Sequence, residues 1–246
     1  MSRRCMWQSH ADSQWQESLI ASLLWLISLM MVGIKLRETR PYTDCCKIIF
    51  LGDSITQAGV LQDGYIALAA EQISQQYPHL AIELVGAGIN GHKVPNCRKR
   101  LDRDVLQTNP SIVVIYIGVN DVWHWQQQRG TTAEDFEGGL RDMIARIHLQ
   151  GAKVIHCTPS VIGEKTDATN KYDHMLDAYA QISRTIAHET GSQLLDLRVE
   201  FMRYLKAHNP DNAASGILTK DGVHLNKAGN HFLSLLMLEA LNLSML

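Results

Sequence analysis

The chain has 246 residues, of which 46% are hydrophobic and 20% are charged. This length suits one large α/β domain or at most two small ones, and it can bury most of its apolar surface without metal or disulfide staples. The composition excludes a disordered or fibrous protein. The formal net charge of -2 argues against a nucleic-acid-binding protein, which would carry a basic surplus.

The N-terminal tail carries the longest apolar run of the chain, from Leu19 to Ile34. A bilayer-spanning helix needs about 20 residues, so this run predicts a single membrane anchor and excludes a multi-pass topology. A cleavable signal peptide and a true start at Met30 or Met31 are the alternatives. We therefore divide the chain into a tail, residues 1–44, and a domain, residues 45–246. We expect a membrane-anchored or secreted protein, or a cytoplasmic one if the chain starts at Met30 or Met31.

Short apolar runs alternate with longer amphipathic stretches from Lys47 onward. The runs predict strands at Lys47–Leu51, Ile82–Val85, Ile112–Ile117, Lys153–Cys157 and Leu194–Leu197. Two of them, KIIFL and IVVIYI, are continuously apolar, which is typical of strands covered on both faces. The stretches between and after them predict helices at Tyr65–Tyr77, Val94–Thr108, Thr132–Gly151, Tyr172–Thr190 and Asn226–Leu243. This order predicts one doubly wound α/β domain with a parallel sheet.

Function in such a sheet lies in the loops at the carboxyl ends of the strands. The first strand is followed by Gly52-Asp53-Ser54-Ile55-Thr56. A serine between a strand and a helix can present its hydroxyl at the sheet edge, with its own N–H at the positive helix end. A plain turn is the alternative, and Thr56 argues against the G-x-S-x-G elbow of the α/β-hydrolases.

The second strand is followed by Gly86-Ala87-Gly88-Ile89-Asn90-Gly91, which matches the G-x-G-x-x-G pattern of dinucleotide-binding proteins. Three features argue against that reading. The motif follows the second strand rather than the first, Pro95 interrupts the stretch where the phosphate-binding helix should run, and the next strand ends without the expected acidic residue. The better interpretation is that glycines let a backbone N–H face a ligand, with a tight empty loop as the alternative.

Two further loops contain polar residues suited to catalysis. The third strand is followed by Gly118-Val119-Asn120-Asp121, where Asn120 can offer its side-chain NH₂ toward Ser54 or make an Asx-turn. The last helix is preceded by Asp221-Gly222-Val223-His224, in which a carboxylate can orient the imidazole and leave its other nitrogen free as a base. Together these loops supply a nucleophile, an oriented base and oxyanion donors, the requirement for acyl transfer.

The four segments, in this order, resemble the four sequence blocks of the SGNH, or GDSL, hydrolase superfamily. The resemblance covers the domain from Cys45 to the C-terminus. It implies a three-layer α/β/α flavodoxin-like fold with a five-stranded parallel sheet, and a serine esterase without a cofactor or metal. It also implies that Ser54 is the nucleophile, His224 the general base and Asp221 its orienting acid. The oxyanion donors would be the N–H groups of Ser54 and Gly91 and the side chain of Asn120.

The chain departs from this pattern at Asn90, where many members have a small serine, which leaves the shape of that loop and the substrate open. Asp53, Trp123 and Trp125 are candidate substrate-binding residues, and a surface loop pinned by the two tryptophans is the alternative for that pair. The five cysteines form no CxxC pair and no zinc-like spacing, and we expect Cys97 and Cys157 to be buried thiols, with His156 a buried structural neighbour.

We therefore expect an esterase that acts on a small or carbohydrate-borne ester. The expected partner is this small-molecule substrate, without nucleic acid and with a single membrane anchor as a possibility. A catalytically silent SGNH-fold module that binds a ligand or glycan is the alternative. A dinucleotide enzyme is the third hypothesis and would bind nicotinamide or flavin.

Overall fold

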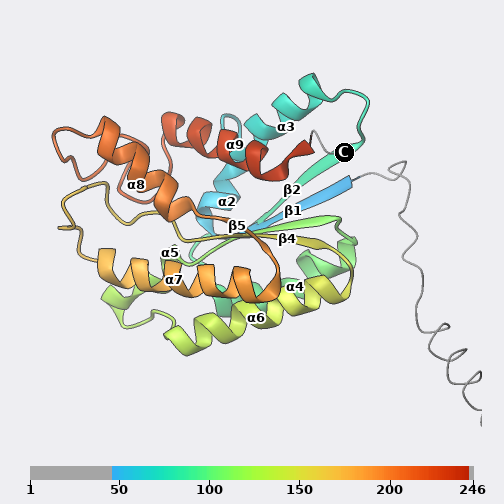
Figure 1. Ribbon diagram of the computed structural model, residues 1–246, viewed down its shortest axis with the longest axis horizontal. Helices are drawn as coiled ribbons and strands as arrows, with labels where there is room; N and C mark the ends of the chain where they lie inside the picture. The colour runs from blue at the N-terminus through green and yellow to red at the C-terminus, as the bar shows by residue number, and fades with distance from the viewer. Residues whose placement is uncertain (1–45, 244–246) are drawn as a thin grey trace, which may run out of the picture. The chain divides into compact units, whose positions relative to one another are not determined.

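A parallel five-stranded sheet forms the centre of the computed structural model, which describes residues 46–243 (Figure 1). The strands are β1 (Cys46–Gly52), β2 (Ile82–Gly88), β3 (Ile112–Tyr116), β4 (Lys153–Cys157) and β5 (Gln193–Leu195). Their order in the sheet is β2-β1-β3-β4-β5, and every neighbouring pair is parallel. The predicted α/β class and parallel five-stranded sheet are therefore confirmed.

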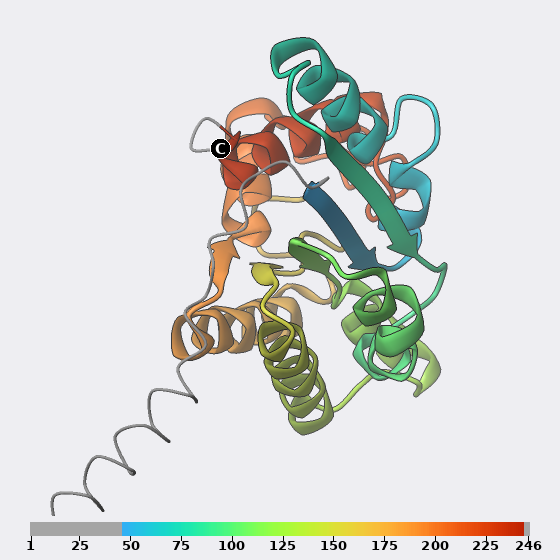
Figure 2. The ribbon, with the colours of Figure 1, turned by 90° about the vertical axis from the view of Figure 1, so that its right-hand side faces the viewer.

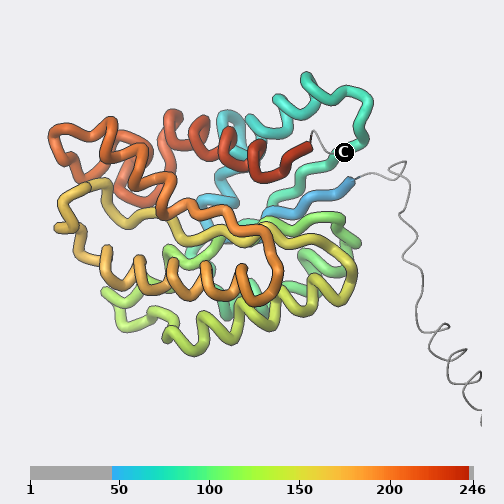
Figure 3. Tube along the Cα trace, viewed as in Figure 1, coloured from blue at the N-terminus to red at the C-terminus, as the bar shows by residue number. Residues whose placement is uncertain are grey.

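The helices cover the two faces of this sheet. They are α2 (Ser54–Gly59), α3 (Tyr65–Gln76), α4 (Val94–Asp104), α5 (Val119–Trp123), α6 (Ala133–Leu149), α7 (Asp173–Thr190), α8 (Leu197–His208) and α9 (Lys227–Leu241). Figures 1 and 2 show α3 and α9 on one face and α4, α6 and α7 on the other. The trace in Figure 3 shows that α3 (teal) and α9 (red) lie side by side although they are far apart in the sequence.

Burial on both faces explains the composition of the central strands. All residues of β3 are buried, and Ile48 to Leu51 of β1 have at most 1% of their surface exposed. An apolar side chain gains about 1.5–3 kcal/mol from full burial, so both faces of these two strands contribute to the core. This is why β1 and β3 are continuous apolar runs rather than alternating ones.

The structure adds the short helices α2 and α5, and it differs from the predicted elements in other places. Strand β2 continues through Gly86 to Gly88 instead of ending at Val85. The predicted helix Val94–Thr108 is interrupted at Val105, after which a separate 3-10 turn ends at Asn109 with a left-handed φ of 53° before Pro110. Leu197 begins helix α8 rather than ending a strand, because the Asp196 side chain caps the helix by accepting a hydrogen bond from the Val199 N–H.

The sheet order places a topological switch point beside β1. The chain passes from β1 outward to β2 and then back across to β3 on the other side, so the carboxyl ends of these strands open toward one crevice. The predicted tail (1–44) and its apolar run, Leu19 to Ile34, lie outside the described residues. None of the helices between residues 46 and 243 combines the length and apolar character that a membrane span requires.

Candidate active site

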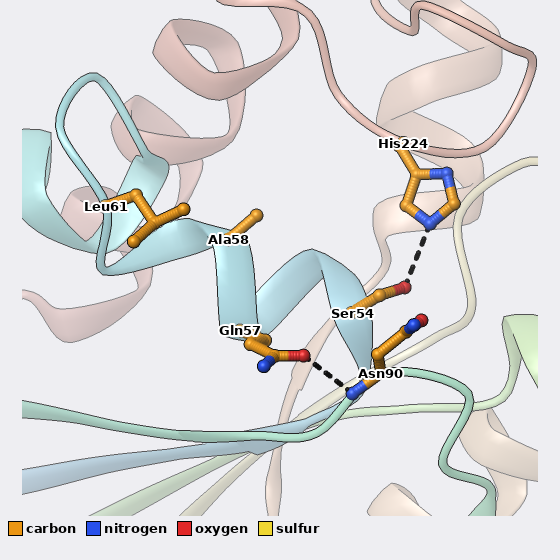
Figure 4. A pocket seen from close by; sticks show the side chains of 6 residues that line it. All are labelled: Ser54, Gln57, Ala58, Leu61, Asn90 and His224. Carbon is orange, nitrogen blue, oxygen red and sulfur yellow. Dashed lines mark hydrogen bonds between the residues drawn. The ribbon is translucent and has the colours of Figure 1, made fainter.

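Ser54 occupies the first position of helix α2, immediately after β1. The side chain of Asp53 caps this helix by accepting a hydrogen bond from the Ile55 N–H at 3.0 Å. The Ser54 hydroxyl points away from the sheet and lies 3.0 Å from Nε2 of His224 (Figure 4). The structure therefore joins the two residues that the sequence assigns as nucleophile and base.

The His224 ring is oriented by Asp221. Asp221 Oδ2 lies 2.7 Å from His224 Nδ1, and Oδ1 accepts hydrogen bonds from the backbone N–H groups of Val223 and His224. Burial pushes the pKa of Asp221 upward, but these hydrogen bonds outweigh it and leave the pKa below its usual value. An ionised Asp221 accepts a hydrogen bond from Nδ1–H and keeps the proton on that nitrogen, so Nε2 is left as an acceptor for the Ser54 hydroxyl.

Two further loops reach the same crevice. Gly91 has a left-handed φ of +73°, and a Cβ added there would meet no atom within 4 Å. Asn120, only 4% exposed, donates from Nδ2 to the carbonyl of His92 at 3.1 Å and to Oδ2 of Asp53 at 3.4 Å. The amide group of Asn120 thus links the end of β1 to the loop that contains Gly91.

Gln57 is a site residue that the sequence analysis missed. Its Oε1 accepts a hydrogen bond from the Asn90 N–H at 2.8 Å, one residue before Gly91 (Figure 4). Gln57 lies three residues after Ser54, so the two side chains stand one helical turn apart on α2. The serine-bearing helix and the Gly91 loop are therefore held together directly. The helical spacing from Ser54 is the signal that could have pointed to Gln57.

The two leading glycines of the G-x-G-x-x-G segment serve packing. A Cβ on Gly86 would lie 2.3 Å from Val60 Cγ1, and a Cβ on Gly88 would lie 2.1 Å from the backbone nitrogen of Gln57. Both glycines lie in β2, so they let α2 and the residue after it approach this strand closely. Gly86 and Gly88 are therefore explained by packing, and a backbone N–H that faces a ligand stays a prediction for Gly91.

Two carboxyl groups beside the site are buried. Burial raises the pKa of Asp53 to about 7 and that of Asp121 to about 6. Asp53 faces Asn120, and Asp121 accepts a hydrogen bond from the Val94 N–H at the start of α4. Both carboxyl groups therefore fix neighbouring elements. Asp53 does not line the cavity beside Ser54 and His224.

A cavity of about 360 Å³ opens beside the Ser54–His224 pair. It is lined by Ser54, Gln57, Ala58, Leu61, Asn90 and His224 (Figure 4). The apolar part of this lining consists of Ala58 and Leu61, both from the region of α2. The cavity is thus small and open to solvent.

The two candidate tryptophans lie in different environments. The ring of Trp123 packs edge-on against the ring of His224, with centroids 6.2 Å apart. Trp125 instead lies against Gly130, where an added Cβ would come within 2.2 Å of the indole ring. Trp123 is therefore placed next to the base, whereas the contacts of Trp125 are those of the pinned surface loop that the sequence analysis kept as the alternative.

Comparison with known proteins agrees with this geometry. The sequence profile of the GDSL-like lipase/acylhydrolase family matches residues 50–232. The chain is 30% identical over 205 residues to an acetylxylan esterase of Geobacillus stearothermophilus, covering 76% of this chain and 90% of that one. It is 24% identical to the isoamyl acetate-hydrolyzing esterase 1 homolog of Rattus norvegicus, with coverages of 76% and 78%. The crystal structure of an acetyl xylan esterase, AlAXEase, superposes with a TM-score of 0.78 at 44% identity, covering 79% of this chain and 98% of that one.

Proposed function

The chain belongs to the GDSL-like lipase/acylhydrolase family and hydrolyses ester bonds, and on this premise we propose that it removes acetyl groups from carbohydrates. The uninterrupted hydrogen-bonded chain from Ser54 through His224 to Asp221, with contacts of 3.0 and 2.7 Å, is the observation that carries the assignment of roles. We assign the esterase domain to residues 45–246.

In the proposed reaction, Ser54 Oγ attacks the ester carbonyl carbon while its proton passes to Nε2 of His224. The bond to the alcohol oxygen then breaks, and the proton moves from His224 to that oxygen as the alcohol leaves. A water molecule attacks the acyl group on Ser54, and His224 takes its proton. This second step releases the carboxylic acid and restores the Ser54 hydroxyl.

The negative charge on the carbonyl oxygen needs donors during both steps. We assign this role to the N–H groups of Ser54 and Gly91 and to the side chain of Asn120. The Ser54 N–H belongs to the first turn of α2, where backbone N–H groups lack an intrahelical acceptor. The left-handed backbone at Gly91 and the nearly complete burial of Asn120 support these positions for the donors. Asn120 would exchange its longer contact, 3.4 Å to Asp53, for the oxyanion, since its NH₂ has two hydrogens and the other donates to His92.

The cavity supports a short acyl group. Each buried CH₂ group of an acyl chain gains about 0.8 kcal/mol, but only where apolar surface covers it. Ala58 and Leu61 are the apolar side chains of the lining, and Leu61 is itself 63% exposed. A long chain would therefore remain largely in water. The aromatic ring of Trp123 beside His224 supports a carbohydrate as the alcohol, because a sugar ring can stack on an indole.

Substitution of Ser54 by alanine tests this proposal. We expect Ser54→Ala to lose at least about a thousand-fold in kcat on p-nitrophenyl acetate and on acetylated xylo-oligosaccharides, because the nucleophilic oxygen is absent. The matched control is Ser74→Ala, which removes an exposed hydroxyl on α3 that donates to the Glu71 carbonyl. A fluorophosphonate probe should label the wild type and Ser74→Ala but not Ser54→Ala. Equal turnover by folded Ser54→Ala would refute the assignment.

A further inference from the structure

A fully buried carboxylate lies outside the catalytic pocket. Glu164 belongs to the loop between β4 and α7 and has 0% of its surface exposed. In the part of the chain that the structure describes, no lysine or arginine forms an ion pair with it. A charge buried in this way is costly unless hydrogen bonds replace its lost hydration.

Four donors from one short segment supply these hydrogen bonds. Glu164 Oε2 accepts from the Ile217 N–H at 2.8 Å. Oε1 accepts from the Leu218 N–H at 2.7 Å, the Thr219 N–H at 2.6 Å and the Thr219 hydroxyl at 2.8 Å. Three consecutive backbone N–H groups thus converge on one carboxylate. The segment they belong to ends two residues before Asp221.

This segment is one side of a narrow turn, residues 216–226, that carries Asp221 and His224 at its tip; we call it the acid–base turn. Thr219 and Leu225 form an antiparallel bridge across it. The Asn226 N–H donates to the Leu218 carbonyl at 3.0 Å, and the Lys220 N–H donates to the His224 carbonyl at 2.8 Å. Glu164 therefore binds residues 217–219 at one end of the acid–base turn, and Asp221 and His224 lie at its tip.

A second connection runs from Glu164 to the tip. The Thr219 hydroxyl donates to Glu164 Oε1 and also accepts a hydrogen bond from the Gly222 N–H at 3.0 Å. The Gly163 N–H, from the neighbouring residue of the same loop, donates to the Gly222 carbonyl at 2.8 Å. Gly222 lies between Asp221 and His224; its N–H is joined to Glu164 through the Thr219 hydroxyl, and its carbonyl accepts directly from Gly163.

We propose that Glu164 is a positioning residue of the esterase reaction: it holds the acid–base turn so that Nε2 of His224 stays within hydrogen-bond distance of Ser54 Oγ. The inference rests on the proposed function, since it needs His224 to be the base. It predicts a specific loss in the variant Glu164→Gln. One carboxamide position carries an NH₂ group, which would face a backbone N–H donor of residues 217–219 instead of accepting from it.

The expected effect follows from the sensitivity of catalysis to geometry. A misplacement of about 1 Å in a catalytic group can cost about 100-fold in rate. We expect Glu164→Gln to lower kcat by about 10–100-fold and to leave KM within about three-fold, because Glu164 does not line the cavity where substrate binds. A merely structural role would instead lower the folded fraction without changing the kcat of the molecules that remain folded.

The matched control is Asp173→Asn. Asp173 is also a buried carboxylate, at the first residue of α7, but it bonds to Arg198 at 2.9 Å and to Asn170, not to the acid–base turn. We expect Asp173→Asn to lower the unfolding temperature and to keep kcat within about three-fold of the wild type at 25 °C, where it is folded. Active-site titration with a fluorophosphonate counts the competent molecules in each sample.

Thr219 provides a second, milder test that does not disturb the backbone contacts. Thr219→Ala removes the hydroxyl that joins Glu164 to Gly222, and Thr219→Ser restores it. We expect a loss of several-fold in kcat for Thr219→Ala and recovery in Thr219→Ser. This pair keeps the proposal testable if Glu164→Gln does not fold.

A double-substitution cycle separates positioning from other roles. If Glu164 acts through the Asp221–His224 pair, the kcat loss from Glu164→Gln should shrink in the background of Asp221→Asn. An undiminished loss in that background, or a wild-type kcat for both Glu164→Gln and Thr219→Ala, would overturn the inference. A failure of the proposed function is distinct, because it shows as esterase activity in Ser54→Ala. If Ser54→Ala is inactive but Glu164→Gln and Thr219→Ala keep the wild-type kcat, only the positioning role is refuted.

Discussion

His156 lies in the middle of the sheet and should make the protein sensitive to acid. It belongs to β4, pairs in register with Ile115 of β3 and Leu194 of β5, and is fully buried. Neither of its ring nitrogens has a hydrogen-bond partner among the described residues. Burial therefore lowers the pKa of His156 to about 4.

The size of the effect follows from linkage between protonation and folding. Below the ordinary pKa of 6.5 the unfolded chain binds a proton at His156, whereas the folded protein does not bind it until the pH reaches about 4. The stabilising effect is therefore complete above pH 6.5 and is lost as the pH falls toward 4. Each pH unit in that window contributes about 1.4 kcal/mol, so His156 alone lowers the free energy of unfolding by about 2 kcal/mol between pH 7 and pH 5.

We expect the substitution His156→Leu to remove this dependence. Leucine leaves no unsatisfied polar atom, so the free energy of unfolding of His156→Leu at pH 7 should lie within about 1.5 kcal/mol of that of the wild type. Urea unfolding of both proteins at pH 7 and pH 5 gives the measurement. Asp53, whose pKa is raised to about 7, contributes with the opposite sign, but it is present in both proteins and cancels in the comparison. Equal pH slopes for wild type and His156→Leu would refute the reasoning.

Two further predictions concern residues beside Ser54 and His224. We expect Asn120→Ala to lower kcat by about 10²–10³ while KM changes by no more than a few-fold, because the charge that Asn120 stabilises exists only in the transition state. Asn120→Asp should be at least as damaging. Steady-state kinetics that show Asn120→Asp near the wild type would contradict this role. We also expect Trp123→Ala to raise KM several-fold for an acetylated xylo-oligosaccharide but not for p-nitrophenyl acetate. Trp125→Ala is the control and should change neither KM value. An equal effect of Trp123→Ala on both substrates would argue against stacking of a sugar on Trp123.

The sequence predicted best those parts of the molecule that depend on local patterns. Continuous apolar runs identify β1 and β3 because both of their faces are buried, and polar residues directly after the strands mark the carboxyl edge of the sheet. Helix α8 was missed although Leu197, Phe201 and Leu205 recur at helical spacing and are all buried. The short apolar run that includes Leu197 fits a strand as well as the start of a helix, so the local pattern does not distinguish the two.

Other features depend on contacts that no local pattern reveals. The donors that surround Glu164 lie 53 to 55 residues away along the chain, so nothing near Glu164 in the sequence indicates its burial. The roles of Gly86 and Gly88 likewise depend on how closely α2 and the residue after it pack against β2, which only the folded arrangement determines. The G-x-G-x-x-G motif can be found in the sequence, but the packing that requires these glycines cannot.

The 170 residues that separate Ser54 from His224 have a consequence for the timing of activity during synthesis. The nucleophile, Gln57 and the Gly91 loop all belong to the part of the chain that the ribosome makes first. The base arrives only with the acid–base turn, just before the last helix α9, and domains of this kind fold only when such long-range contacts can close. A polypeptide released early, anywhere ahead of His224, would carry the serine without its proton acceptor. Prematurely terminated products should therefore be inert toward esters.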